Sequence, residues 1–381
     1  MGYRYIGAKN KLKDHILKEI SNIIGPSGHV VDMMSGTGQV SRFLREAGYK
    51  VTAVDVMTYS FHHAKVQLFI NKAPLFRELE EMKEIKCIKK NTENLFGITN
   101  YEAVLTYLND IEPEKGYLWK ECSPGGKPKN GENPRKYFTE ENACKIDTIR
   151  EKIENWKQNK KISDLEESLL IHDLILAAND IANIAGTYGH YLSKIIQRAK
   201  DPMVMKPFNF ASDSNVEHHK VIKGYAEKTA EYIQADLCYI DPPYMKRQYA
   251  ANYHILETIA VGDAPEAAGV SGLRPWRNQY SNFCSKIKIR DAFIEIIEKM
   301  DCQHFLISYS EDGLLSADEL KNLLDKFGNV KIQNIKYKRF KSNDSKLGSQ
   351  LNEYLIHLEK SIQIFPRAKH SQQYEHAQGA M

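Results

Sequence analysis

The sequence predicts an α/β protein in which one parallel sheet is interrupted by a large, mostly helical insertion. Three observations support this prediction: helix and strand patterns alternate over the first seventy residues, the alternation then stops, and it returns with an apolar strand late in the chain. We therefore expect a discontinuous sheet domain (1–74 and 233–362), an inserted domain (75–232) and a polar tail (363–381).

Hydrophobic periodicity predicts the N-terminal part of the sheet. Apolar residues at helical spacing predict a helix over 12–24, which a Gly-Pro-Ser-Gly turn ends. An apolar run at 29–33 predicts a buried strand, and a helix over 40–47 leads to a second strand at 50–56. Strand, helix and strand in this order are typical of a parallel sheet.

The rest of the chain supplies the insertion and the return to the sheet. Residues rich in Gly, Pro, Lys and Asn predict a long loop over 117–137, and helices are expected over 144–157 and 163–184. Later strands are expected at 235–240, 304–308, 330–337 and 353–358, with a helix that begins in a capping box from Ser316 to Glu319. The Gly-, Ala- and Pro-rich segment 262–275 is expected to be a mobile connection, with a role as a lid as the second possibility.

Composition limits the class of protein. The chain has 381 residues and a formal net charge of +4, which permits a polyanionic partner without requiring one. Its six cysteines form no Cys-x-x-Cys pair, so we expect reduced thiols and no metal site. The polar N-terminus and the lack of an apolar run of about eighteen residues predict neither a signal peptide nor a membrane span. We therefore expect a cytoplasmic protein.

A glycine-containing loop follows the first predicted strand. It runs from Asp32 to Gly38, with Gly36 between them, and its backbone N–H groups can approach a ligand closely. Asp55 ends the next strand, where a carboxylate can accept hydrogen bonds from both hydroxyls of a ribose. This pair predicts an adenosine-containing cofactor but does not choose between S-adenosylmethionine and NAD. Ser41 in place of the third glycine of the dinucleotide motif disfavours NAD.

The stronger signal is Asp241-Pro-Pro-Tyr244, directly after an apolar strand. Two prolines cannot continue a parallel strand, so they fix a rigid turn at its carboxyl end, where α/β proteins place their sites. Asp241 and the Pro242 carbonyl supply two acceptors, and Tyr244 supplies a flat ring. These groups suit methylation of the adenine amino nitrogen: the acceptors localise its lone pair and the ring stacks on the base. The base would have to be flipped out of a duplex.

Together these segments resemble the Dam-like, or alpha-group, DNA adenine-N6 methyltransferases, especially members from type II restriction-modification systems. In that group an aromatic-x-Gly-Gly-Lys element comes first, an Asp-x-Phe-x-Gly-x-Gly loop follows, and an insertion separates them from Asp-Pro-Pro-Tyr. Here the first element is Tyr5-Ile-Gly-Ala-Lys9, and the stretch 239–258 is especially similar to the type II members. Ala8 and Met34 depart from the pattern, which bears on the fine shape of the cofactor pocket.

The resemblance implies a Rossmann-like fold, S-adenosylmethionine as cofactor without a metal, and a site in double-stranded DNA as substrate. It implies cofactor contacts by Tyr5, Lys9, Asp32, Gly36, Gly38, Asp55 and Asp241, with the loop residues at the methionine end and Asp55 at the ribose. Asp241, Pro242 and Tyr244 would be catalytic, with Asp241 serving both the cofactor and the target amine. A cognate restriction endonuclease that acts on the same site, without a stable complex, is a possible partner. The protein would be nucleoid-associated in a prokaryote.

The residues themselves leave other functions open. Another planar amine is possible as substrate, namely cytosine N4, an RNA base or a protein glutamine; so is a DNA-binding protein that has lost its activity, and an NAD oxidoreductase is a more distant possibility. The initial Asp of the turn favours adenine over cytosine, and the large insertion favours reading of duplex DNA. The residues expected to contact DNA are Lys127, Lys129, Arg135, Lys136, Lys246, Arg247, Lys338 and Arg339.

Overall fold

The computed structural model describes residues 9, 11–91, 97–129, 133–210, 216–338 and 350–361. Its strands are β1 (His29–Met33), β2 (Lys50–Asp55), β3 (Lys220–Lys223), β4 (Leu237–Ile240), β5 (His304–Ser310), β6 (Gly328–Lys338) and β7 (Gln350–Lys360). Its α-helices are α1 (Lys13–Ile24), α2 (Gln39–Glu46), α3 (Thr58–Phe69), α4 (Arg77–Glu80), α5 (Lys83–Asn91), α6 (Asn100–Asp110), α7 (Tyr117–Cys122), α8 (Glu140–Gln158), α9 (Asp164–Asp180), α10 (Ala226–Thr229), α11 (Tyr249–Asn252), α12 (His254–Val261), α13 (Ile289–Lys299) and α14 (Ala317–Leu324).

The seven strands form one sheet in the order β3-β2-β1-β4-β5-β7-β6. β2 and β3 lie on one side of β1, and β4, β5, β7 and β6 lie on the other, so β1 and β4 flank the point where the strand order reverses. In open α/β sheets the crevice at the carboxyl ends of such strands is where ligands bind. The fold therefore places the residues that follow β1 and β4 beside each other.

The expectation of one parallel sheet is correct for five strands and wrong for the last pairings. β7 runs antiparallel to both β5 and β6. Only residues 339–349 connect β6 to β7, which is short for the crossover that a parallel pair requires. The short connection makes β7 antiparallel to β6. The apolar pattern of a strand does not reveal whether it runs parallel or antiparallel to its neighbour.

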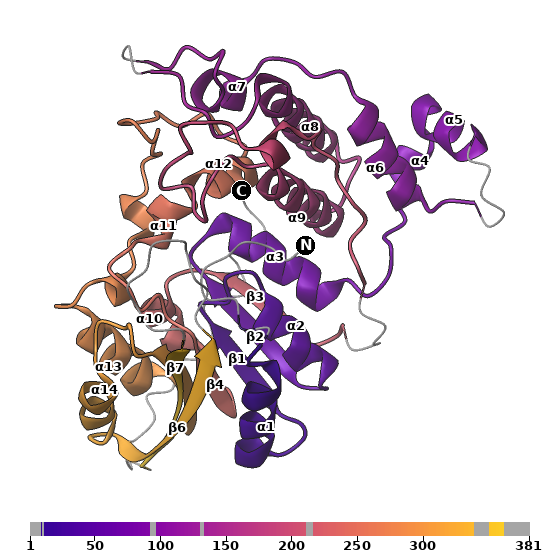
Figure 1. The fold of residues 1–381 in the computed structure, drawn as a ribbon. Helices are drawn as coiled ribbons and strands as arrows, with labels where there is room; N and C mark the ends of the chain where they lie inside the picture. The colour runs from indigo at the N-terminus through magenta and orange to yellow at the C-terminus, as the bar shows by residue number, and fades with distance from the viewer. Residues whose placement is uncertain are drawn as a thin grey trace.

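Alternating strand residues pack on the two faces of the sheet. Val30 belongs to a cluster with Ile16 of α1 and Phe43 of α2, whereas Val31 belongs to a cluster with Phe293 of α13 and Leu320 of α14. Buried parallel strands are apolar on both faces for this reason. Figure 1 shows the sheet and these helices in the lower part of the molecule, with helices α4 to α9 above them.

The insertion is mostly helical, as the sequence predicts, and it packs on α3 and α12. Tyr59 and Val66 of α3 share a core cluster with Ile175 of α9 and Leu256 of α12, while Ala64 of α3 packs toward the sheet. α3 is thus buried on two sides, and it joins the sheet to the insertion.

Two segments within the predicted insertion differ from expectation. β3 lies inside 75–232 yet pairs in parallel with β2, so we propose that the inserted domain ends before Lys220. α7 forms where a loop was expected over 117–137, because Asp147 of α8 accepts hydrogen bonds from Leu118 N at 2.8 Å and Trp119 N at 2.8 Å. The free N–H groups of this helix are therefore satisfied by a residue distant in sequence.

Arg135 is a correction to the predicted DNA-binding surface. Its side chain is 0% exposed and donates to Glu121 Oε2 at 2.7 Å and to the carbonyls of Gly269 and Val270 at 2.9 and 3.2 Å. A guanidinium buried among these partners cannot contact DNA. The same bonds connect the segment 262–275 to the insertion, and its Ala268 and Leu273 pair with each other. The mobility of this segment stays a prediction.

Candidate active site

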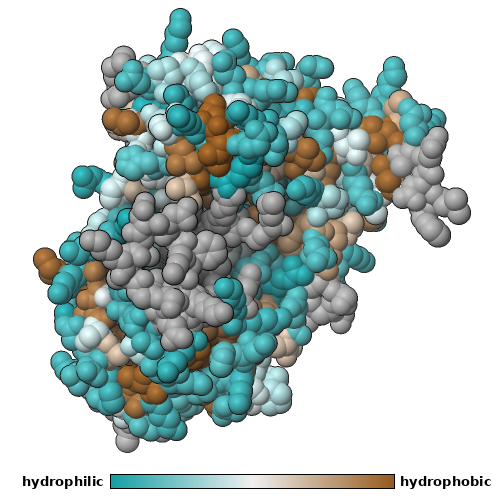
Figure 2. All heavy atoms as spheres, viewed as in Figure 1, coloured by the Kyte–Doolittle hydropathy of each residue, from teal (hydrophilic) through white to brown (hydrophobic). Residues whose placement is uncertain are grey.

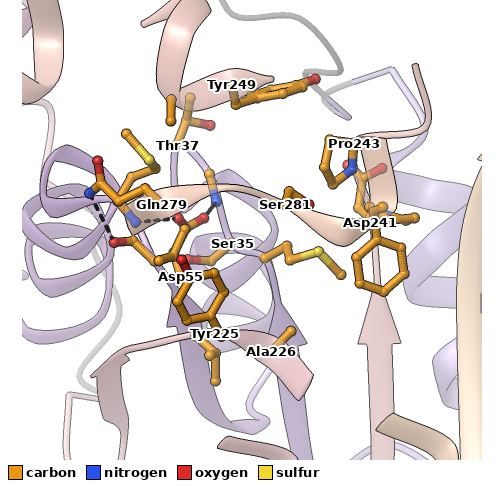
Figure 3. A pocket seen from close by; sticks show the side chains of 18 of the residues that line it. Ser35, Thr37, Asp55, Tyr225, Ala226, Asp241, Pro243, Tyr249, Gln279 and Ser281 are labelled. Atoms are coloured by element: carbon orange, nitrogen blue, oxygen red, sulfur yellow. Dashed lines mark hydrogen bonds between the residues drawn. The ribbon is translucent and has the colours of Figure 1, made fainter. Parts of the chain in front are cut away.

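A pocket opens at the carboxyl ends of β1, β2 and β4, as the switch in strand order predicts. Its lining includes Lys9, Met34, Ser35, Gly36, Thr37, Asp55, Val56, Met57, Tyr225, Asp241, Pro242, Pro243, Tyr244, Tyr249, Gln279 and Ser281. In Figure 3, Asp55, Tyr225 and Gln279 lie toward one end of this pocket and Asp241 and Pro243 toward the other. Both predicted motifs therefore face one cavity.

Asp241 pairs with Lys9 at the floor of the pocket. The two are 3.0 Å apart, and the Lys9 side chain is only 4% exposed. Burial raises the pKa of Asp241 above its ordinary value and Lys9 opposes this, whereas burial would lower the pKa of Lys9 but Asp241 raises it. The Lys9 ammonium also lies 5.6 Å from the ring centroid of Tyr244, within range of a cation–π contact.

The Asp-Pro-Pro-Tyr turn contacts β5 and the residues that follow it. Its backbone leaves the sheet at Ile240, and the carbonyl of Tyr244 accepts a hydrogen bond from Leu314 N at 3.0 Å. The Tyr244 ring meets Tyr309 edge to face at a centroid distance of 5.9 Å, which fixes the ring plane. Burial raises the pKa of Tyr244 to about 12, so the phenol stays neutral.

Asp55 organises the glycine loop. Its two carboxylate oxygens accept hydrogen bonds from Gly36 N at 2.8 Å and Met57 N at 2.9 Å, as Figure 3 shows. Gly36 has a φ of +53°, a conformation that favours glycine. Burial raises the pKa of Asp55 to about 6, against the lowering effect of these two hydrogen bonds.

Asp32 and Gly38 are not among the residues that line the pocket, and their predicted contact with the methionine end stays a prediction. Asp32 is 1% exposed and accepts a hydrogen bond from Ser41 Oγ at 2.6 Å, so it ties β1 to α2 behind the loop. Burial raises its pKa to about 7. A Cβ on Gly38 would meet backbone atoms of Ala64 at 3.2 and 3.3 Å, so this glycine is required for close packing of the loop on α3.

Several lining residues carried no usable sequence signal. Tyr225 follows β3, the strand that the sequence did not reveal, and Gln279 and Ser281 belong to an irregular segment with no motif. Tyr249 lies in the stretch 239–258 that resembles the type II members, so the resemblance could have suggested it. These residues reach the pocket only through the tertiary fold.

The remaining residues expected to bind DNA differ in their surroundings. Lys127, Lys129, Lys246 and Arg247 are exposed. Lys136 is half-buried, and its Nζ donates to the carbonyl of Ser193 at 3.1 Å. Tyr5, Arg339 and the side chain of Lys338 lie outside the described residues.

Within the described ranges, no three His, Cys, Asp or Glu side chains gather as a group that could hold a metal ion. No helix in those ranges is long and apolar enough to cross a membrane. All six cysteines are free thiols, and Cys87 alone among them is exposed.

Comparison with known proteins agrees with this geometry. The family model described as D12 class N6 adenine-specific DNA methyltransferase matches residues 5–339. The chain is 34% identical over 376 residues to the type II methyltransferase M.FokI of Planomicrobium okeanokoites, covering 98% of this chain and 55% of that protein. It is 30% identical over 368 residues to the type II methyltransferase M.NlaIII of Neisseria lactamica, covering 94% and 99%.

The relatives differ in length. The chain is 29% identical over 364 residues to the modification methylase StsI of Streptococcus sanguinis, covering 94% of this chain and 52% of that protein. It therefore spans about half the length of both M.FokI and StsI. The family match covers both ends of the sheet and the insertion between them. The chain belongs to the D12 class of N6 adenine-specific DNA methyltransferases.

Proposed function

We propose that this protein transfers a methyl group from S-adenosylmethionine to the N6 amino group of a flipped adenine in duplex DNA. One observation carries the proposal: the Asp241-Pro-Pro-Tyr244 turn and the loop that Asp55 organises line the same pocket. The two halves of a methyl transfer, a place for the donor and a place for the amine, are thereby adjacent. The family and the resemblance support the choice of adenine.

The residues present fit S-adenosylmethionine. Asp55 is a half-buried carboxylate at the pocket wall, with lone pairs beyond those that Gly36 and Met57 use, and it suits ribose hydroxyls. Asp241 lies at the opposite end of the pocket, where a carboxylate suits the cationic methionine end. When bound, the cofactor supplies a methyl group attached to a sulfonium, from which a neutral thioether is a good leaving group.

The catalytic turn would act by positioning. Asp241 and the Pro242 carbonyl accept the two N6 hydrogens, which localises the lone pair on nitrogen, and Tyr244 stacks on the base. Lys9 keeps Asp241 an acceptor by favouring its ionised form. The bound cofactor would supply the methyl group to N6 and be left as the neutral thioether, and the proton that N6 loses would pass to water.

We also propose a role in restriction-modification. The relatives M.FokI and M.NlaIII are named type II methyltransferases, which favours a modification enzyme with a cognate endonuclease that shares its DNA site. The helical insertion would recognise the target sequence, and the exposed Lys127, Lys129, Lys246 and Arg247 would contact phosphates. We place the protein in the cytoplasm, near its DNA.

The test is methylation with labelled S-adenosylmethionine and adenine-containing duplex DNA, followed by identification of the modified nucleoside. We expect label on N6-methyladenine, with a rate that falls at least about a thousandfold in Asp241→Ala. Asp318→Ala, an exposed aspartate on α14, is the control and should keep wild-type activity. Label found only on cytosine, RNA or protein would reject adenine as the target, and full activity of Asp241→Ala would reject the role of the carboxylate.

A further inference from the structure

Gln279 is a pocket residue whose amide has a fixed orientation. It ends the short 3-10 turn Arg277–Gln279 and lines the pocket beside Val56 and Met57. Its Nε2 donates to Glu257 Oε1 at 2.7 Å and to the carbonyl of Val56 at 3.3 Å. Both amide hydrogens are therefore engaged, and the oxygen remains as an acceptor.

Glu257 determines which way the amide faces. It lies on α12, is 1% exposed, and accepts hydrogen bonds from Thr58 N at 2.9 and 3.0 Å and from Tyr59 N at 3.2 Å, at the start of α3. With Gln279, three N–H groups converge on one carboxyl group, which is the arrangement expected around a carboxylate that only accepts. If the amide turned over, its oxygen would face the oxygens of Glu257 and the Val56 carbonyl. The amide is therefore locked with nitrogen inward.

The position of Gln279 indicates which ligand group it meets. Asp55 suits the ribose, and Val56 and Met57, which follow it, line the pocket beyond that point. Asp241, the proposed acceptor of the target amine, lies toward the opposite end, as Figure 3 shows. The ligand part beside Gln279 is therefore the base of a nucleoside cofactor, and a lone acceptor there matches a base that carries an exocyclic amino group.

We propose that Gln279, locked by Glu257, selects the cofactor by accepting a hydrogen bond from the 6-amino group of its adenine. A 6-oxo base would instead place its carbonyl oxygen against the amide oxygen, with neither group able to donate. Gln279 is thus a specificity-determining residue for the cofactor, and Glu257 is a positioning residue that acts through it. This inference rests on the proposed use of an S-adenosyl cofactor.

Binding without catalysis tests the proposal. S-adenosylhomocysteine and its deaminated analogue S-inosylhomocysteine are titrated into the wild-type protein and followed by calorimetry, with no DNA present. We expect the wild type to favour the adenosine compound by about tenfold or more, the size of effect of a buried acceptor left unsatisfied. Gln279→Leu should bind the adenosine compound about tenfold more weakly and lose the preference.

Glu257→Gln gives the sharper result. A glutamine at 257 can donate to the Gln279 oxygen, so the amide can turn and present N–H to the pocket, and the preference should shift by about tenfold toward the inosine compound. Asn278→Leu changes the exposed neighbour of Gln279 and should leave the ratio of affinities as in wild type. If Glu257→Gln does not fold in thermal melts, Gln279→Leu decides alone.

The outcomes separate this inference from the proposed function. A wild-type protein that binds the adenosine compound but shows no preference, or a preference unchanged in Gln279→Leu, rejects the role of Gln279 and leaves the proposed methyl transfer standing. Failure of the wild type to bind either compound rejects the S-adenosyl cofactor itself. A lost preference in Gln279→Leu supports the inference, whichever base is methylated.

Discussion

Lys9 illustrates how one residue can control the chemistry of a site that it does not enter as a reactant. Its ammonium lies 3.0 Å from the Asp241 carboxylate and 5.6 Å from the centroid of the Tyr244 ring. Glu353 of β7, 6% exposed, also interacts with Lys9, and burial raises the pKa of Glu353 to about 7. Burial raises the pKa of Asp241, and Lys9 is the group that limits the rise. The ionised state of Asp241, the proposed acceptor, therefore depends on this cation.

Replacement of Lys9 by Met should shift the acid limb of the pH profile. Without the cation, burial of Asp241 is no longer opposed, so the pKa of its carboxyl rises and the acceptor becomes protonated at higher pH. We expect kcat/KM at neutral pH to fall about a hundredfold or more and the acid limb to move upward by about one pH unit or more. Lys9→Arg, which keeps the charge, should shift it less.

The control for Lys9 is Lys13→Met, at the start of α1, where the lysine is 41% exposed and faces Glu46. It removes an equal charge from a site away from the pocket and should leave the profile unchanged. An acid limb that stays in place in Lys9→Met would mean that Lys9 acts only in packing.

Single residues also show what the sequence could reveal. Asp55, Asp241 and Tyr244 were found because motifs place them at or just after strand ends, and the fold brings strand ends together. Lys9 was found through the N-terminal element of the family resemblance. The burial of Arg135 could not be foreseen, because the carbonyls of Gly269 and Val270 that it binds lie 134 and 135 positions away. A basic residue in a polar loop is expected at the surface unless such partners are known.

At the scale of elements, the contact of α3 with α9 contains a pair of buried histidines. His63 Nδ1 and His172 Nδ1 are 2.7 Å apart, so one ring donates and the other accepts. Burial lowers the pKa of His63 to about 3 and that of His172 well below its ordinary value. Both rings are therefore neutral at physiological pH, and the interface between the sheet domain and the insertion requires them to be so.

Acid should weaken this interface. Because the folded pKa of each ring lies below the unfolded value of about 6.5, the unfolded chain binds more protons below pH 6.5, and the free energy of unfolding falls as pH falls. Each buried neutral ring should lower the free energy of unfolding of the protein by about 2 kcal/mol between pH 7 and pH 5. In urea unfolding, the double variant His63→Gln/His172→Gln, which keeps a hydrogen-bonding pair without titration, should lose correspondingly less.

A matched control for the histidine pair is His218→Gln, which replaces an exposed ring. Its free energy of unfolding should follow the wild type at every pH. Equal slopes for the wild type and the double variant between pH 7 and pH 5 would show that the two rings do not titrate on unfolding as inferred.

Elements were predicted well where one local pattern decides them. The strand at 29–33 is β1 as observed, and the Ser316 capping box is confirmed by Glu319 N, which donates to Ser316 Oγ at 3.1 Å. β3 was missed because it has four residues, of which Lys220 and Lys223 are lysines, and it is held at the sheet edge by β2. Short edge strands depend on their neighbour more than on their own sequence.

For the whole molecule, the open question is how a chain of modest net charge holds a polyanion. In Figure 1, α7 lies at the upper left and α5 at the upper right of the molecule. The sheet, which carries the Asp-Pro-Pro-Tyr turn, lies below them. On the face drawn in Figure 2, hydrophilic residues cover most of the described surface and apolar residues gather in small groups. A formal net charge of only +4 favours binding through separate basic groups over one large basic face.

The salt dependence of DNA binding should reveal both contributions. Each phosphate contact that is lost lowers the slope of log K against log salt by about 0.9. Lys127→Ala/Lys129→Ala in the insertion and Lys246→Ala/Arg247→Ala beside the catalytic turn should therefore each lower the slope by up to about 1.8 in fluorescence titrations with cognate duplex. The four-fold variant should lower it by the sum, because the two pairs lie on different domains and contact different phosphates.

Lys83→Ala/Lys90→Ala on α5 removes the same net charge from exposed lysines at the far side and provides the matched comparison. If affinity depended only on net charge, all three double variants would change the slope equally, and the idea of a DNA path across the two domains would fail. If the path is as inferred, the α5 variant keeps the wild-type slope, because charges separated from the phosphates by more than a Debye length of about 8 Å are screened. The slope thus distinguishes a directed binding path from general electrostatic attraction.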